Sequence, residues 1–232
     1  MKNIYILLLS FAFSITISAQ QKETRSLNNF TSLKVSGGIS VELLDGEPSA
    51  EIEVIKGEME DLVTEVKGNT LYVKFGRKGM FNWNSGNRKA HVALSGGLDV
   101  NEIDVSAGAY VGSDDMVKNS EVDLDASSGG SIEIEIESGE TYASASSGGS
   151  IKLSGMTKNL DAEASSGGSI NGKKLQAKNV KAEASSGGSA SVWVTDELEA
   201  SASSGGSVTY KGDPGTKDID VGKYSGGSVR RI

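Results

Sequence analysis

The sequence contains no cysteine and only one histidine, His91, in 232 residues. The absence of cysteine excludes disulfides, thiolate metal sites and a lipid anchor on a cysteine behind a leader segment. One histidine excludes a metal site built from several histidines and gives little basis for serine–histidine catalysis. A lone histidine beside an alternating strand is most often a surface residue, and we expect His91 at the surface. We predict no catalytic residues, no metal site and no cofactor.

Basic residues are scarce relative to acidic ones. The chain has 23 Lys and Arg against 31 Asp and Glu, which gives a net charge of −8. Removing the leader predicted below takes away only Lys2, so that 22 basic and 31 acidic residues leave a net charge of −9. Such a chain repels polyanions, so we expect neither nucleic acid nor anionic lipid as a partner. The hydrophobic content of 37% is adequate for a modest core.

Long hydrophobic runs are confined to the start of the chain. Lys2 precedes an apolar stretch over residues 4–17 that ends near Ser18 and Ala19, which is typical of a signal peptide comprising residues 1–19. A transmembrane anchor is the alternative, but an anchor needs about 20 apolar residues. No second segment of spanning length follows, so we expect no integral membrane segment in the mature chain. We expect a secreted protein, exported by its signal peptide to the periplasm or to the cell surface or extracellular space.

A repeat dominates the second half of the chain. The stretch "SSGGS" occurs five times and "YSGGS" once, with starts at Ser127, Ser146, Ser165, Ser185, Ser203 and Tyr224. The interval between successive starts is nearly constant and varies by only one or two positions. Apolar and polar residues alternate straight through the copies, whereas a flexible Gly/Ser linker would interrupt the alternation. This combination predicts an all-β fold, a parallel β-helix (β-solenoid) with coils of about 19–20 residues.

We interpret each copy as a corner of a coil, where the two glycines let the strand turn. In the phase of the alternation, the second serine of each copy points inward, and stacking places equivalent residues about 4.8 Å apart. Hydroxyls bonded to one another in a ladder would avoid the cost of about 1–3 kcal/mol for each unpaired buried hydroxyl. The expected corner ladder comprises Ser128, Ser147, Ser166, Ser186, Ser204 and Ser225.

The two ends of the mature chain differ from its middle. We expect residues 20–110 to form an N-terminal β region with the first irregular coils and a hairpin excursion, and residues 111–232 to form the regular repeats. At the tip of the excursion, Phe81 and Trp83 are candidate ligand contacts; alternatively, they cover the end of the solenoid. In the last copy Lys223 takes a position that earlier coils give to alanine, which indicates a capped end or a loss of register. Pairing of solenoid ends into a homo-oligomer stays open.

Acidic side chains offer a second candidate chemistry, because acids on neighbouring coils of a parallel β-helix can act as general acid and base on polysaccharides. Glu163 and Glu183 are expected side by side, where they could bind a cation, although a solvated acidic face is the simpler interpretation. The glycine-rich copies match neither a phosphate-binding loop nor a calcium-binding nonapeptide. One outward column is expected to comprise Asp123, Tyr142, Asp161, Lys181, Glu199 and Asp220.

Three features in order carry a family resemblance: "NNFTSLKVSGGISVELLDGE" at 28–47, "NTLYVKFGRKGMFNWNSG" at 69–86, and the downstream Gly-Gly-Ser-Ile repeats. In this combination, nearly the whole mature chain resembles the family described as "putative auto-transporter adhesin, head GIN domain", which comprises exported bacterial β-helix proteins. The resemblance implies a right-handed parallel β-helix from a Gram-negative bacterium with a role at the cell surface, and it implies no catalytic residues.

We therefore expect an exported, non-enzymatic β-solenoid that serves as a cell-surface or periplasmic adhesion or binding module, with surface glycans or proteins as partners. The alternative function is that of a carbohydrate-active enzyme, a polysaccharide hydrolase or lyase built on a parallel β-helix.

Overall fold

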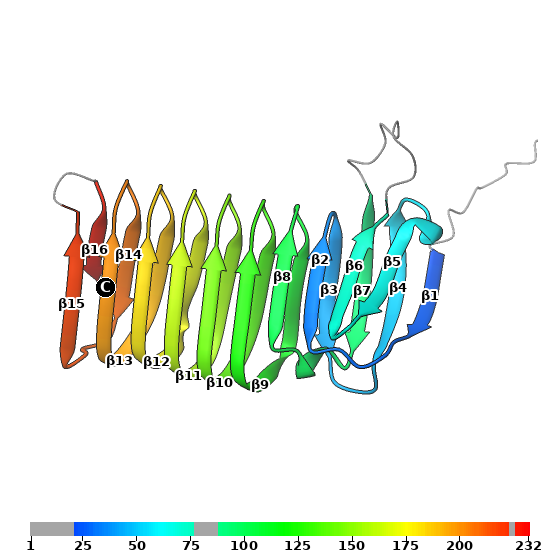
Figure 1. Ribbon diagram of the computed structural model, residues 1–232, viewed down its shortest axis with the longest axis horizontal. Coiled ribbons are helices and arrows are strands. Elements are labelled where there is room, and N and C mark those ends of the chain that lie inside the picture. The colour runs from blue at the N-terminus through cyan, green and yellow to red at the C-terminus, as the bar shows by residue number, and fades with distance from the viewer. Residues whose placement is uncertain (1–20, 77–87, 223–225) are drawn as a thin grey trace, which may run out of the picture.

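The computed structural model describes residues 21–76, 88–222 and 226–232. Strands account for most of these residues and wind into a right-handed β-solenoid of about seven turns, as the sequence predicts (Figure 1). The described ranges contain no α-helix, and short 3-10 helices occur at η1 (Met59–Asp61) and η3 (Gly97–Asp99). No helix in this part of the chain is long and apolar enough to cross a membrane.

Each coil has two walls. We call the stretch before each "SSGGS" turn the first wall, which faces the viewer in Figure 1, and the stretch after it the second wall. The long strands β10 to β13 each start in the second wall, bend, and continue into the first wall of the next coil. The strands are β1 (Gln21–Ser26), β2 (Ser32–Ser36), β3 (Ile39–Leu44), β4 (Ser49–Lys56), β5 (Leu62–Lys67), β6 (Thr70–Phe75), β7 (Lys89–Ser95), β8 (Glu102–Ser106), β9 (Tyr110–Ala126), β10 (Ser131–Ala145), β11 (Ser150–Ala164), β12 (Ser169–Ala184), β13 (Ser189–Ala202), β14 (Ser207–Lys211), β15 (Thr216–Val221) and β16 (Ser228–Arg231).

Neighbouring coils pair in parallel with equivalent residues opposite each other. In β10 and β11, for example, Ile132 opposes Ile151 and Ala143 opposes Ala162. Because side chains alternate with a period of two, this register turns the same positions inward in every coil. The inward residues form one contiguous hydrophobic core along the axis.

The "SSGGS" corners are tight turns. The N–H of Gly130 donates to the carbonyl oxygen of Ser127 at 2.8 Å, and Ser128 and Gly129 have φ values of 50° and 76°. Left-handed conformations at both central residues define a type I′ turn, which reverses the chain within two residues. The next glycine, Gly130, is buried against the preceding coil, where a Cβ would overlap the carbonyl oxygen of Val105. The corner thus needs its second glycine for close stacking of the coils.

The expected inward orientation of the corner serines is wrong. The left-handed turn takes these residues out of the alternation, so their side chains stand exposed at the tip of each coil. Exposed serines with φ of 49–50° are Ser128, Ser147, Ser166, Ser186 and Ser204. Ser225, the last member of the expected ladder, lies outside the described residues.

Buried hydroxyls do bond one another, but at the opposite end of the coil. Thr141 and Thr157 are almost fully buried, and their Oγ1 atoms lie 3.0 Å apart. The Oγ of Ser138 lies 2.7 Å from the Thr141 hydroxyl and 2.9 Å from that of Thr157. Each hydroxyl of this cluster finds partners within it, which removes the penalty for burying a polar group.

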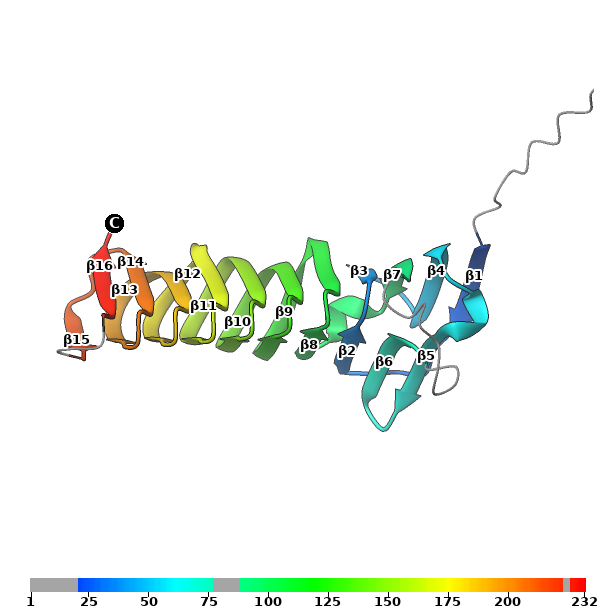
Figure 2. The same ribbon diagram turned by 90° about the horizontal axis from the view of Figure 1, so that it is seen from above.

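At the N-terminal end, the order of coils in space differs from their order in the chain. The coil of β2 and β3 lies between the coil of β6 and β7 and the coil of β8 and the start of β9. Between β7 and β8 the chain therefore passes from one side of its first coil, formed by β2 and β3, to the other side. Strands β5, β4 and β1 then add antiparallel pairings outside this end. Figure 2 shows the two walls diverging here, with β2, β6 and β5 on one side and β3, β7, β4 and β1 on the other.

The C-terminal end of the solenoid carries charged residues at inward positions. Lys217 of β15 and Arg231 of β16 are in register with buried residues of the preceding coil, and both reach Asp213, at 3.3 and 3.0 Å. Inward charges discourage further strand pairing, so we expect Lys217 and Arg231 to oppose the addition of strands at this end. Lys223, for which the sequence suggested this capping role, lies outside the described residues. Nearer the turns the core is open, and Ile219 is 43% exposed.

Candidate functional site

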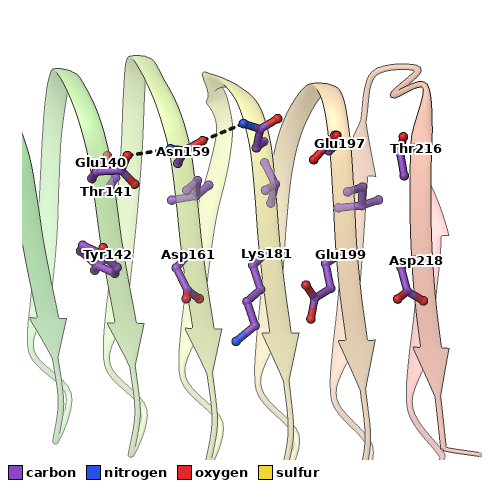
Figure 3. Close-up of a pocket in the computed structure, with 14 residues that line it drawn as sticks. Glu140, Thr141, Tyr142, Asn159, Asp161, Lys181, Glu197, Glu199, Thr216 and Asp218 are labelled. Atoms are coloured by element: carbon purple, nitrogen blue, oxygen red, sulfur yellow. Dashed lines mark hydrogen bonds between the residues drawn. The ribbon is translucent and has the colours of Figure 1, made fainter.

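A groove of about 430 Å³ runs along the solenoid axis over the first wall, at the end remote from the "SSGGS" turns (Figure 3). Strands β10, β11, β12, β13 and β15 contribute residues at equivalent positions, because the strands pair in register. Three rows line it: a polar row of Glu140, Asn159, Asn179, Glu197 and Thr216, a floor of Thr141, Leu160, Val180 and Leu198, and a mixed row of Tyr142, Asp161, Lys181, Glu199 and Asp218.

The polar row contains a hydrogen-bonded ladder. Asn179 Nδ2 donates to Asn159 Oδ1 at 2.7 Å, and Asn159 Nδ2 donates to Glu140 Oε1 at 2.6 Å (Figure 3). The backbone of the ladder is fixed at Asn159, because Thr157 Oγ1 of the buried hydroxyl cluster donates to the carbonyl oxygen of Asn159 at 3.0 Å. An amide group has two N–H donors and two acceptor lone pairs, so each asparagine keeps bonding capacity for a ligand. The coils thus present oriented amides about 4.8 Å apart.

The mixed row combines an aromatic ring with charges. The Tyr142 side chain is 44% exposed at the first coil of the groove. Lys181 Nζ lies 2.9 Å from Glu183 Oε1, and this hydrogen bond, together with the nearby charge of Asp161, raises the pKa of Lys181. One oxygen of Asp161, Oδ1, is shielded from solvent and has no hydrogen-bond partner.

The net charge of the groove is negative. Lys181 is its one cationic side chain among the lining residues, against the carboxylates of Glu140, Asp161, Glu197, Glu199 and Asp218. The groove therefore favours an uncharged or cationic ligand over a polyanion.

The expected outward column is correct except at its end, where Asp218 takes the place predicted for Asp220. Glu199 opposes Asp218, and the same register continues to the pair of Ala202 and Val221. The last interval between copies, from Ser203 to Tyr224, is longer than the interval before it. The strand register places one additional residue between Lys211 and Thr216 and two after Val221, and the sequence spacing alone does not locate them. Glu163 and Glu183 are neighbours in register, as expected.

The remaining candidate residues lie elsewhere. Phe81 and Trp83 fall outside the described residues, so their role stays a prediction. His91 is on the second wall, partly exposed, with Nε2 3.7 Å from Glu42 Oε2. The described ranges contain no group of three or more His, Cys, Asp or Glu placed to hold a metal ion. Sequence reasoning missed the Asn159–Asn179 ladder, although asparagines at equivalent positions of consecutive repeats were a usable signal.

These features define a class of protein: a β-solenoid whose regular outer surface carries an elongated groove. The sequence profile of the family described as "Putative auto-transporter adhesin, head GIN domain" matches residues 29–214. The chain belongs to this family. None of the curated proteins searched matches the chain.

Solved structures share the fold. A "putative adhesin" from Bacteroides fragilis superposes with a TM-score of 0.81 at 17% identity, covering 93% of this chain and 98% of that one. A "putative adhesin" from Parabacteroides distasonis gives a TM-score of 0.70 at 20% identity, covering 92% and 97%. A "putative lipid binding protein" from the same species gives 0.66 at 18% identity, covering 93% and 98%. The family supports an adhesion or binding module, and these structures show that the fold is shared.

Proposed function

We propose that this chain is an exported, non-enzymatic adhesion module whose groove holds an extended, chain-like partner at the cell surface or in the periplasm. One observation carries the proposal: five successive coils present side chains at equivalent positions to a single groove that runs along the axis. A linear polymer laid along this axis would meet side chains at equivalent positions of each coil, about every 4.8 Å. Export rests on the signal peptide expected at residues 1–19, which lie outside the described residues.

An uncharged surface glycan is the partner that this groove fits best, and a surface protein with an extended segment is the alternative. Sugar hydroxyls can donate to the carboxylates and bond the amides of Asn159 and Asn179. The ring of Tyr142 offers a flat apolar face with a polar tip at one end of the row. The negative charge of the groove disfavours acidic polysaccharides. The names of the structural neighbours, adhesins and a lipid-binding protein, also indicate binding rather than turnover.

The test is binding of the mature protein to immobilised polysaccharides, with uncharged and acidic chains compared at the same salt concentration. Tyr142→Ala should weaken binding of an uncharged chain about 2- to 12-fold, the equivalent of about 0.5–1.5 kcal/mol for an aromatic contact. Tyr110→Ala is the matched control, because this tyrosine is 38% exposed on the second wall. Equal losses in the two variants, or binding confined to acidic chains, would exclude the groove as the adhesion site.

The enzymatic alternative has one observation in its favour, since Asp161 and Glu199 flank Lys181 along the groove. A pair of carboxylates that flanks the scissile bond is the requirement for glycoside hydrolysis. Incubation with the same polysaccharides should yield no new reducing ends and no unsaturated products. If the wild type releases such products and Asp161→Asn does not, the proposed function is wrong and the protein is an enzyme.

A further inference from the structure

A second hollow lies on the second wall and shares no residue with the groove. Its volume is about 370 Å³, within the range of about 300–1,000 Å³ that is usual for small-molecule sites. It extends over β10 and β11 and ends at β9 and β12. Its floor is apolar, formed at Ile134 and Leu153, which are 2% and 1% exposed. We call this hollow the trough.

Bulged strands bound the trough at both ends. Residues 113–115 of β9 stand opposite the single residue Ile134 of β10, and residues 172–173 of β12 stand opposite Leu153 of β11. Extra residues bend a strand and change the direction of its side chains. Each bulge therefore forms a rim at one end of the trough. The β9 bulge is braced by Ser113, whose Oγ donates to the carbonyl oxygen of Leu43 at 3.0 Å. The result is a trough two coils long with a bulged strand at each end.

The two rims carry opposite charges. Asp114 lies at the β9 rim with Glu135 beside it, and Lys173 and Lys174 lie at the β12 rim. Within the part of the chain that the structure describes, none of these four side chains forms an ion pair, whereas Glu133 and Lys152 between them pair with each other. The trough is therefore neutral at its middle, acidic at one end and basic at the other.

We propose that the trough binds a short peptide with free termini, about three residues long, with its ammonium group at Asp114 and Glu135 and its carboxylate at Lys173 and Lys174. The length follows from the coil spacing. Glu135 and Lys174 lie in coils two steps apart, which is about 9.6 Å at 4.8 Å for each step. An extended chain of three residues spans about 10 Å. Its small side chains would lie over the apolar floor.

The experiment is a titration of the mature, isotope-labelled protein with triglycine, followed by amide chemical shifts in NMR spectra. N-acetyl-triglycine and triglycine amide each lack one terminal charge, while glycine and hexaglycine test length. Exposed charge pairs contribute about 0.2–1 kcal/mol, so loss of either terminal charge should weaken binding about 1.4- to 5-fold. Shifts are expected at Leu153 and Ser154, and they should decrease as added salt screens the charges.

Exposed side chains at the rims supply the variants, so folding should be unaffected. Asp114→Asn and Lys174→Gln should each weaken triglycine binding by the same factor, while Lys178→Gln, an exposed lysine outside the trough, should leave it unchanged. Equal affinity for the acetylated or amidated peptides, shifts confined to the first wall, or no shift at all would overturn the proposal. Because the trough and the groove lie on opposite walls, this outcome is independent of the Tyr142→Ala test.

Discussion

Stacking of the coils is tested most directly at the second glycine of a turn, and Gly168 lies in the middle of the solenoid. An added Cβ at Gly168 would overlap the carbonyl oxygen of Ala145 in the preceding coil. That oxygen already accepts a hydrogen bond from the N–H of Ser165 at 2.9 Å. Gly168→Ala must therefore move the two coils apart locally or break this bond.

The expected cost can be separated from the cost of the turn conformation. Overpacking costs about 1–3 kcal/mol and one lost hydrogen bond about 1 kcal/mol, so Gly168→Ala should lower the free energy of unfolding by about 2–4 kcal/mol. At Gly167 a Cβ meets open space, and Gly167→Ala carries only the left-handed conformation at φ of 74°, a cost of about 1–2 kcal/mol. Ser166 already adopts φ of 49°, and asparagine tolerates this region better. Ser166→Asn should therefore stabilise the fold slightly.

Thermal unfolding monitored by circular dichroism measures this series. In a chain of this size, 1 kcal/mol corresponds to about 2–4 °C in Tm, so Gly168→Ala should lower Tm by about 4–16 °C and by more than Gly167→Ala does. Ser166→Asn should raise it. Hydrogen exchange at the Ser165 amide should accelerate in Gly168→Ala alone. If Gly168→Ala is as stable as Gly167→Ala, the close approach of successive coils at this corner is not what requires the glycine.

Two further predictions concern charge. Partial desolvation, with the carboxylate of Glu102 next in importance, raises the pKa of Asp123, so the folded state holds this proton more tightly than the unfolded state does. The ionised form therefore costs stability at neutral pH, and the cost disappears as pH falls through the folded-state pKa towards the unfolded value of about 3.9. Asp123→Asn should raise the free energy of unfolding at pH 7 by about 0.2–1 kcal/mol, and by less at pH 4. Urea unfolding measures both values, and equal gains at the two pH values would show that the charge of Asp123 is not the cause. The double variant Lys217→Leu/Arg231→Leu should associate through the C-terminal end, because it removes the inward charges there. If light scattering at high concentration shows the wild-type mass for this variant, these charges are not what prevents association.

Much of the architecture could be predicted from local patterns, because those patterns are themselves the physical requirement of the fold. Alternation with a period of two decides which side chains enter the core, and the interval of the repeat decides how long a coil is. The outward column from Asp123 to Glu199 follows from the same two regularities. Prediction failed where one residue leaves the pattern: Ser128 in its left-handed turn points to solvent, although the alternation assigns it to the core.

The candidate sites depended on information that a repeat pattern does not carry. Asn159 and Asn179 each look like an ordinary outward polar residue, and only the register of neighbouring strands joins them to Glu140. The bulges that close the trough arise from additional residues in β9 and β12, and alternation does not say where such residues are accommodated.

By itself, the sequence determined the solenoid, the length of its coils, the inward row of small and apolar residues, and the position of each corner, since all of these are properties of one coil and its immediate neighbour. The tertiary structure alone decided the order of the N-terminal coils, the ion pairs of Lys217 and Arg231 with Asp213, and the walls on which the groove and the trough lie. These features join residues that are distant in the chain or separated by irregular insertions, and their proximity depends on how whole coils pack.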